Sequence, residues 1–435
     1  MKKILSILMI LAMLASCALA GAEATVVNAA SDRGIKLQPA GENTVPENVS
    51  PVTGRDLTTL PVPDGFLGMV ATGVYYPVLV QHNGYASGTG NAAPWNGSYA
   101  DVIYEQPKAQ AGYTRMTMLF NDYYPQYVGA SRSIRVGHVW VRQEWDAMLL
   151  HAGAQEAKDS KYNTSVPDAL RALGISRYET DSEKRVIYNA LDGFSPNKLW
   201  TKYRYRVKGL ASSYNVVWDL QALSMEVFPQ NKEFPNHTWK FTDELPTEGD
   251  DASRVYIMFN KDHFKTGDVD KDDGVYYFNS VLEYEPDENV YYRTFLDKLS
   301  YTSDGIAVIE GKLFTELVPS NVKISKMADQ WYKMSCDKSQ GEAITFSNVI
   351  VQFIDMKWPS GEQPYPILTG TGNADYFMGG KHISGMWKRD TYNDRTVYYG
   401  ADGEEISLQR GKTLIVLMDY DSVVNGAKVR QVSYE

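Results

Sequence analysis

The spacing of hydrophobic and polar residues in the first half of the chain predicts both strands and a helix. Three short runs, either apolar or alternating, are typical of strands; they are residues 78–80, 101–104 and 115–120. A stripe at intervals of three and four residues follows, as in a helix packed on a core. It consists of Ile134, His138, Val141, Trp145 and Met148. The apolar run 148–150 then predicts a buried strand that ends at His151.

Two further helices are predicted from signals at their ends. A serine with a proline one or two residues later marks each start, at Ser165 and Ser195. A glycine marks each end, at Gly174 and Gly209. We therefore expect a helix between each serine and the glycine that follows it.

The second half of the chain has the pattern of an antiparallel β-structure. Its strands are predicted at residues 255–259, 275–284, 290–295, 349–354 and 413–418. Two glycine-containing pairs, at 379–380 and 402–403, are candidates for hairpin turns. We therefore expect an α+β protein, in which a mixed α/β N-terminal domain precedes a mainly antiparallel β domain, packed as a sheet or a sandwich.

Composition divides the chain into four segments. Residues 1–16 have the form of a lipoprotein signal peptide, and residues 17–50 are small, polar and aperiodic, as in a flexible tether. The acidic stretch 243–251 has no apolar period and contains proline and glycine, which favours a domain boundary there. The predicted domains are residues 51–243 and residues 252–425.

The N-terminal segment predicts export and a lipid anchor. Two lysines precede an apolar run at residues 4–14, which is too short for a transmembrane helix of about 20 residues. Residues 14–17 (LASC) resemble a bacterial lipobox, so Cys17 should receive a diacylglyceryl group with fatty-acyl chains such as palmitate. The protein would then lie on the extracytoplasmic face of the cell membrane. The alternative is cleavage after Ala20, which would release a secreted protein.

Composition also narrows the class of protein. The chain has 53 acidic and 43 basic residues, a net charge of −10 that argues against nucleic-acid binding. Removal of residues 1–16 takes away two lysines and no acidic residue, so the mature chain has a net charge of −12. The two cysteines are Cys17 and Cys336, and acylation of the first would leave the second without a disulfide partner. The 30 tyrosines favour strands and half-buried surfaces.

The segment 128–137 contains the most informative polar residues. If the helix begins at Ser131 or Ser133, Arg132 and Arg135 lie in or beside its first turn, where the backbone already has a partial positive charge. An anion should compensate these charges, either a bound phosphate, carboxylate or sulfate or an internal partner. The candidate internal partners are Asp101, Glu105 and Asp122.

Three other residues are candidates for the same site. Glu105 and Arg115 flank a connection and could face each other across two antiparallel strands, either in the site or as a simple ion pair. His151 ends an apolar strand, a position where ligands gather in α/β proteins, although its role could also be structural. The predicted ligand-binding cleft therefore consists of Glu105, Arg115, Arg132, Arg135 and His151.

Motifs of known chemistry are largely missing from the sequence. The acidic segment 268–274 approaches a calcium loop, but its glycine is one place late and Asn279 occupies the final ligand position, so a solvated loop is preferred. The sequence has no zinc-binding HExxH, no P-loop, no CxxC pair and no GxSxG elbow. We therefore predict no metal, no cofactor and no assigned catalytic residue.

Several segments together resemble the YerB-like bacterial lipoprotein family, whose two domains have unknown function. In the first half the matching runs are residues 51–54 (PVTG), 100–105 (ADVIYE), 112–115 (GYTR), 124–125 (YP), 128–133 (VGASRS), 146–147 (DA) and 151–153 (HAG). In the second half they are residues 292–293 (YR), 348–352 (NVIVQ), 369–372 (TGTG), 380–381 (GK), 385–388 (GMWK) and 403–406 (GEEI). Residues 194–197 (FSPN) depart from the family, which tends to have a Pro-His-Asn run there. The resemblance implies a lipid-anchored, two-domain envelope protein and supplies no catalytic residue.

Three functions fit these observations. The first is a lipoprotein that binds an anionic cell-envelope component or a protein partner through the arginine-rich cleft. The second is a hydrolase or transferase that acts on a cell-wall polymer, with Glu105 or His151 in proton transfer. The third is a scaffold that uses exposed tyrosines to hold a membrane protein. Non-enzymatic binding is preferred because no catalytic motif is present.

Overall fold

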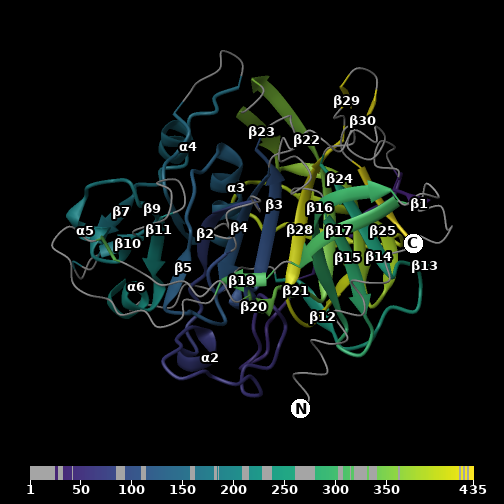
Figure 1. Cartoon of the computed structure of the whole chain (residues 1–435), viewed down its shortest axis with the longest axis horizontal. Coiled ribbons are helices and arrows are strands. Elements are labelled where there is room, and N and C mark those ends of the chain that lie inside the picture. Colours follow the sequence, from purple (N-terminus) through teal and green to yellow (C-terminus); the bar gives the residue numbers. More distant parts are fainter. Residues whose placement is uncertain are drawn as a thin grey trace.

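The computed structural model describes most of the chain after residue 24. The described residues are 25–27, 33–41, 43–84, 94–108, 114–156, 162–180, 184, 186–207, 215–227, 238–259, 280–301, 307–313, 315–317, 331–332, 340–360, 363–420, 423–424, 427–428 and 431–435. Strands predominate over helices in them (Figure 1), and both kinds of element contribute to shared buried cores. The predicted α+β class is confirmed.

A twelve-stranded sheet forms the centre of the molecule. From the first half of the chain come β2 (Val78–Asn83), β3 (Val102–Pro107), β4 (Thr114–Phe120), β6 (Met148–His151) and β9 (Ala190–Asp192). From the second half come β13 (Asp250–Asp251), β22 (Asn348–Ser360), β23 (Gln363–Ile367), β24 (Gly370–Met378), β25 (Lys381–Arg389), β26 (Val397–Tyr399) and β28 (Thr413–Asp419). Their order is β13-β25-β24-β22-β28-β3-β4-β2-β6-β9, with β23 beside β22 and β26 beside β25.

The two halves of the chain meet in the middle of this sheet. Strand β28 pairs with β3 in parallel, from Thr413 opposite Val102 to Val416 opposite Glu105 (Figure 1). One sheet therefore continues across the boundary expected at residues 243–251.

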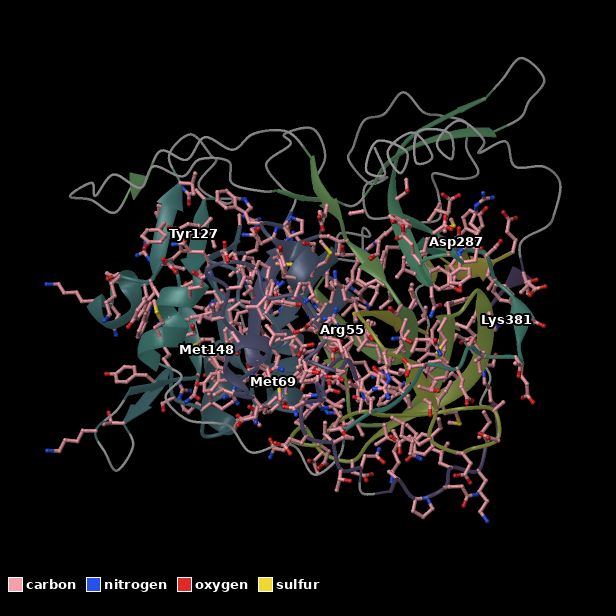
Figure 2. All side chains as sticks on the ribbon, turned by 90° about the horizontal axis from the view of Figure 1, so that it is seen from below. Arg55, Met69, Tyr127, Met148, Asp287 and Lys381 are labelled. Carbon is pink, nitrogen blue, oxygen red and sulfur yellow. The ribbon has the colours of Figure 1, made fainter. Side chains whose placement is uncertain are left out.

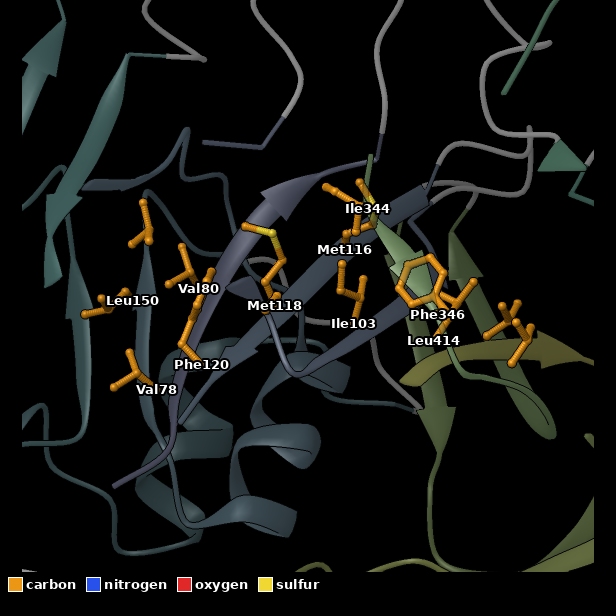
Figure 3. Close-up of a cluster of buried hydrophobic side chains, with 14 of the residues drawn as sticks. Val78, Val80, Ile103, Met116, Met118, Phe120, Leu150, Ile344, Phe346 and Leu414 are labelled. Carbon is orange, nitrogen blue, oxygen red and sulfur yellow. The ribbon is translucent and has the colours of Figure 1, made fainter. Parts of the chain in front are cut away.

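Both faces of the central sheet are buried, which explains its apolar sequence. Met116, Met118 and Phe120 of β4 point to one face, in a buried cluster that Figure 3 shows. We call it the sandwich face, because other sheets cover it. Leu119 points to the opposite face, the helix face, where it belongs to the same buried cluster as residues of α3 (Val136–Trp145) and α4 (Val166–Ala172). The alternation predicted for residues 115–120 is confirmed.

Two sheets cover the sandwich face. One has the order β1-β31-β14-β15-β16-β17, with β21 beside β16. Its strands are β1 (Thr25–Val26), β14 (Arg254–Met258), β15 (Ser280–Glu285), β16 (Val290–Tyr301), β17 (Ala307–Leu313), β21 (Thr345–Phe346) and β31 (Gln431–Tyr434). The other is formed by β19 (Trp331–Tyr332), β10 (Arg204–Val207), β11 (Val216–Asp219) and β5 (Tyr127–Gly129), in that order. Ile257, Phe346 and Trp218 of these sheets lie in the same buried cluster as Val80 and Met118.

The remaining elements are short. They are α2 (Met69–Thr72), a 3-10 turn (Gly97–Tyr99), α5 (Lys198–Thr201), α6 (Leu220–Val227), β7 (Tyr178–Thr180) with β8 (Val186–Tyr188), β12 (Lys240–Thr242) with β27 (Ser407–Gln409), β18 (Thr315–Leu317) with β20 (Gln340–Ala343), and β29 (Val423–Val424) with β30 (Ala427–Lys428).

Most predicted elements are present, and one helix is wrong. Helix α4 has the predicted cap, because the Ser165 hydroxyl accepts the backbone N–H of Asp168 (3.4 Å). The predicted strands correspond to β2, β3, β4, β6, β14, β15, β16, β22 and β28, while residues 275–279 lie outside the described residues. The helix predicted from Ser195 to Gly209 instead ends at Thr201. The chain then forms β10, whose pairing with β11 outweighs local helix preference.

Residues 33–41 and 43–50, part of the segment 17–50 that was expected to be a flexible tether, pack against the body. The Arg33 guanidinium bonds the buried Asp375 carboxylate (2.6 Å) and the carbonyl oxygens of Ala374 (2.7 Å) and Gly385 (2.8 Å). Further upstream, β1 adds a short edge strand to β31 through the pairs Thr25–Tyr434 and Val26–Ser433. The chain is thus joined to the body as early as residue 25.

Candidate functional site

The candidate site lies where several strands of the central sheet end. Strands β2 and β3 each run antiparallel to β4 and so have the same direction, and β6 runs parallel to β2. Asn83, Gln106 and His151 are at or near the carboxyl ends of these strands, and Arg115, near the start of β4, is at the same edge. Ligands commonly bind at such an edge of an α/β sheet.

The segment before α3 runs between the ends of β2 and β6. The Arg132 N–H donates to the carbonyl of Gln81 (3.0 Å), and the Arg132 carbonyl accepts the N–H of Ala152 (3.1 Å). These backbone bonds place Arg132 beside the residue that follows His151.

Helix α3 begins later than predicted. Its first residue is Val136 and its N-cap is Arg135, so the predicted start at Ser131 or Ser133 is wrong. The N–H groups of Ser131 and Arg132 bond instead to carbonyls of β11 (2.7 Å) and β2 (3.0 Å), which keeps this segment extended. Arg135 therefore lies at the first turn of the helix, and Arg132 lies before it.

His138 closes the first turn of α3 and has a defined tautomer. Its Nδ1 accepts the backbone N–H of Arg135 (2.6 Å), and its own backbone N–H donates to the Arg135 carbonyl (3.1 Å). A neutral imidazole that accepts at Nδ1 must have its proton on Nε2. The residue is 1% exposed, and Nε2 has no hydrogen-bond partner within the described residues. The site thus contains a buried donor that needs an acceptor.

Burial keeps His138 neutral. It lowers the pKa of His138 well below the usual range, and the neighbouring charges of Arg135 and Arg115 lower it further. His151 acts on His138 in the same direction, so Arg135, Arg115 and His151 all lie within electrostatic reach of His138.

His151 has the opposite tautomer. Its Nδ1 lies 2.9 Å from the carbonyl oxygen of Gly153, which can only accept, so the proton is on Nδ1 and the lone pair is on Nε2. Burial lowers the pKa of His151, and the Asp192 carboxylate, 4.0 Å from Nδ1, opposes that shift. Two neutral histidines, one a donor and one an acceptor at Nε2, are therefore present at this edge.

Glu105 does not belong to this group. In the register of β3 with β4, Glu105 is opposite Met116 and Arg115 is opposite Gln106, so Glu105 and Arg115 point to opposite faces. The suggested ion pair between them is therefore not formed. On the sandwich face Glu105 bonds the guanidinium of Arg293 and accepts the hydroxyl of Thr114 (2.7 Å).

The other two candidate internal partners lie at the opposite edge of the sheet. Asp101 and Asp122 are both buried, and Arg55, labelled in Figure 2, reaches them at 3.7 Å and 3.5 Å. Asp122 also accepts the hydroxyls of Ser50 (2.6 Å) and Thr53 (2.7 Å). The three carboxylates considered as partners for the α3 arginines are thus bonded to other arginines.

The structure therefore brings together four of the five predicted site residues and adds a fifth. We call the group Arg115, Arg132, Arg135, His138 and His151 the α3 cluster. Sequence reasoning placed His138 in the apolar stripe of the helix because its spacing fits. The signal that could have marked it is the combination of a histidine three residues after an arginine at the start of a helix, where a side chain can cap the backbone.

The remaining candidate features are a metal site, a membrane-spanning helix and the two cysteines. Within the described ranges, no three histidine, cysteine or acidic side chains gather as metal ligands, and no helix is long and apolar enough to cross a membrane. Cys17, Cys336 and the acidic segment 268–274 lie outside the described residues.

Comparisons with known proteins agree with the architecture. Residues 88–214 match the N-terminal domain, and residues 326–415 the C-terminal domain, of "Protein of unknown function (DUF3048)". No curated protein matches the chain in sequence. The crystal structure of YerB protein from Bacillus subtilis is similar, with a TM-score of 0.54 and 17% identity over 86% of this chain and 98% of that one. At this identity the likeness concerns the fold alone.

Proposed function

Because this chain belongs to the YerB-like family of two-domain proteins of unknown function, relatives supply no activity, and we propose one from the α3 cluster. The protein is a lipid-anchored, extracytoplasmic envelope protein that binds an anionic cell-envelope ligand at the start of α3. The observation that supports this proposal most directly is the buried Nε2–H of His138, which has no acceptor within the described residues.

The surroundings of that donor favour an anion. Arg115, Arg132 and Arg135 contribute positive charge, and the N-terminus of α3 adds its partial positive charge. Removal of water strengthens each of these interactions, and Arg115 and His138 are 5% and 1% exposed. An anionic oxygen would satisfy the imidazole donor, and the nearby guanidinium groups would attract its charge.

The first prediction tests binding of the ligand. In a thermal-shift screen with inorganic phosphate, glycerol phosphate and muropeptide fragments, at least one anion should raise the melting temperature of the wild-type protein. Substitution of both Arg132 and Arg135 by alanine should abolish that shift, because it removes two of the three guanidinium groups. Arg171→Gln is the matched control, since this arginine is 75% exposed and its loss changes the net charge without touching the cluster.

The outcome of the same screen separates the candidate functions. Anion binding would be contradicted if no anion raised the melting temperature of the wild-type protein, or if the double variant showed an equal rise. Slow conversion of a muropeptide by the wild-type protein would instead favour a hydrolase or transferase. The opposite tautomers of His138 and His151 support that second candidate, because they offer one donor and one acceptor. Glu105 is not suited to proton transfer there, because it lies on the sandwich face.

A tyrosine-based scaffold has less support. Tyr178 is the one tyrosine among the large apolar side chains that are clearly exposed in the described ranges. Others, such as Tyr291, Tyr376 and Tyr398, are fully buried in the cores. Packing therefore accounts for much of the tyrosine content before any partner does.

The second prediction tests the anchor. If Cys17 is lipidated, β1 begins only eight positions after it, which limits the distance from the anchor to the body to about 28 Å. Cys17→Ala should move the protein from carbonate-washed membranes to the soluble fraction, while Cys336→Ala should leave it in the membranes. Retention of the Cys17 variant in washed membranes would contradict lipidation, and release of wild type without acyl chains would favour a secreted protein.

A further inference from the structure

A second buried polar group lies at the start of α3. The side chain of Gln155 is 9% exposed, and neither its Nε2 nor its Oε1 has a hydrogen-bond partner within the described residues. Its backbone is held firmly, because its N–H donates to the Ile134 carbonyl (3.1 Å) and its carbonyl accepts the N–H of Val166 (2.9 Å). A buried carboxamide with no hydrogen bond at either end lowers the stability of the folded protein. Another group, such as a bound ligand, would normally supply the missing hydrogen bonds.

The register of the backbone places Gln155 beside Arg135 of the α3 cluster. Ile134 and Ala154 form a parallel bridge, so the residues that follow them, Arg135 and Gln155, are neighbours on the opposite side of the two segments from Ile134. Ile134 itself points into the buried core of the helix face. Arg135 is also the residue whose N–H bonds His138 (2.6 Å). Gln155 thus lies next to the arginine that begins α3.

Arg135, His138 and Gln155 together would select a ligand by more than its negative charge. Guanidinium groups suit a carboxylate or a phosphate equally, and the His138 N–H suits any oxygen acceptor. A carboxamide is different, because it donates at Nε2 and accepts at Oε1. An amide of a ligand has one donor and one acceptor and can complete both, whereas a phosphodiester has no donor to offer Oε1.

We propose that the ligand is a peptide or other N-acylated amino acid with a free carboxylate, bound with its carboxylate toward Arg135 and His138 and an amide against Gln155. This inference rests on the proposed function and names the ligand class of the same site. Phosphate polymers share the charge of such a ligand and lack the amide.

The test uses N-acetyl-alanyl-alanine as the probe and isothermal titration calorimetry on the mature chain. The peptide should bind, and its C-terminal amide should bind at least tenfold more weakly, because the carboxylate is lost. Gln155→Leu should weaken binding of the acid at least tenfold, which corresponds to about 1.4 kcal/mol. Gln38→Leu is the control, since Gln38 is exposed on residues 33–41.

The arms of the experiment distinguish two kinds of failure. If glycerol phosphate binds and the peptide does not, the amide-bearing class is wrong and anion binding stands. If neither binds, the proposed function fails as well. Equal affinity of the peptide acid and its C-terminal amide for the wild-type protein would also overturn the inference, and that comparison needs no variant to fold.

Discussion

Replacement of Arg293 by methionine is expected to lower the free energy of unfolding by about 3–5 kcal/mol. Arg293 and Glu105 are both 0% exposed and form an ion pair between the central sheet and the sheet that covers its sandwich face. Without the guanidinium, the Glu105 carboxylate would remain buried with the Thr114 hydroxyl as its remaining described partner. A buried charge without its partner is among the largest single destabilising changes in proteins.

Urea unfolding followed by tryptophan fluorescence would measure this effect. Glu105→Gln combined with Arg293→Met should be more stable than Arg293→Met alone, because the double variant removes the uncompensated charge as well as the pair. Arg171→Met, on the surface, should change the free energy of unfolding by less than about 0.5 kcal/mol. A loss below about 1 kcal/mol for Arg293→Met would mean that water reaches Glu105 and that the pair is not the tie between the sheets.

The same pair shows which features of the fold the sequence could predict. Local alternation was enough to identify β4 and to separate Met116 and Met118 from Arg115 and Thr117, because a strand has a fixed period of two residues. The partner of Glu105 could not be found in this way, since Arg293 is 188 residues away along the chain. The register of β3 with β4 also differs by one residue from what a Glu105–Arg115 pair would need.

The candidate site was predictable in part for a similar reason. Arg132, Arg135 and His151 sit in a short stretch with clear signals, a serine-rich turn and the end of an apolar strand. Gln155 has no such signal, and His138 has only its spacing from Arg135, because the significance of both depends on burial and on side-chain atoms without a partner in the described residues. The helix start was misplaced because Ser131 and Ser133 are good caps in isolation, while pairing with β2 and β11 keeps their segment extended.

A second large effect is expected on stability as pH changes. It arises at Asp101 and Asp122, which lie at the edge of the central sheet opposite the α3 cluster. Burial, and then the neighbouring Asp122, raise the pKa of Asp101 well above its usual value. Folding therefore favours the protonated form of Asp101. Its contribution to stability is fully present below the unfolded pKa of about 3.9 and is lost as pH rises toward the folded pKa. In that window the contribution of Asp101 should fall by about 1.4 kcal/mol per pH unit.

Comparison of wild type with Asp101→Asn isolates this proton from the other carboxylates of the chain. Asparagine keeps an oxygen for the backbone N–H groups of Asn121 (2.7 Å) and Asp122 (2.9 Å), which both bond Asp101 Oδ2. It cannot lose a proton, so the variant should gain stability relative to wild type as pH rises from 4 toward 7. Asp287→Asn, at an exposed turn labelled in Figure 2, should show no such trend. A constant difference between wild type and Asp101→Asn from pH 4 to 7 would show that Arg55, 3.7 Å from Asp101, already compensates its charge in the folded protein.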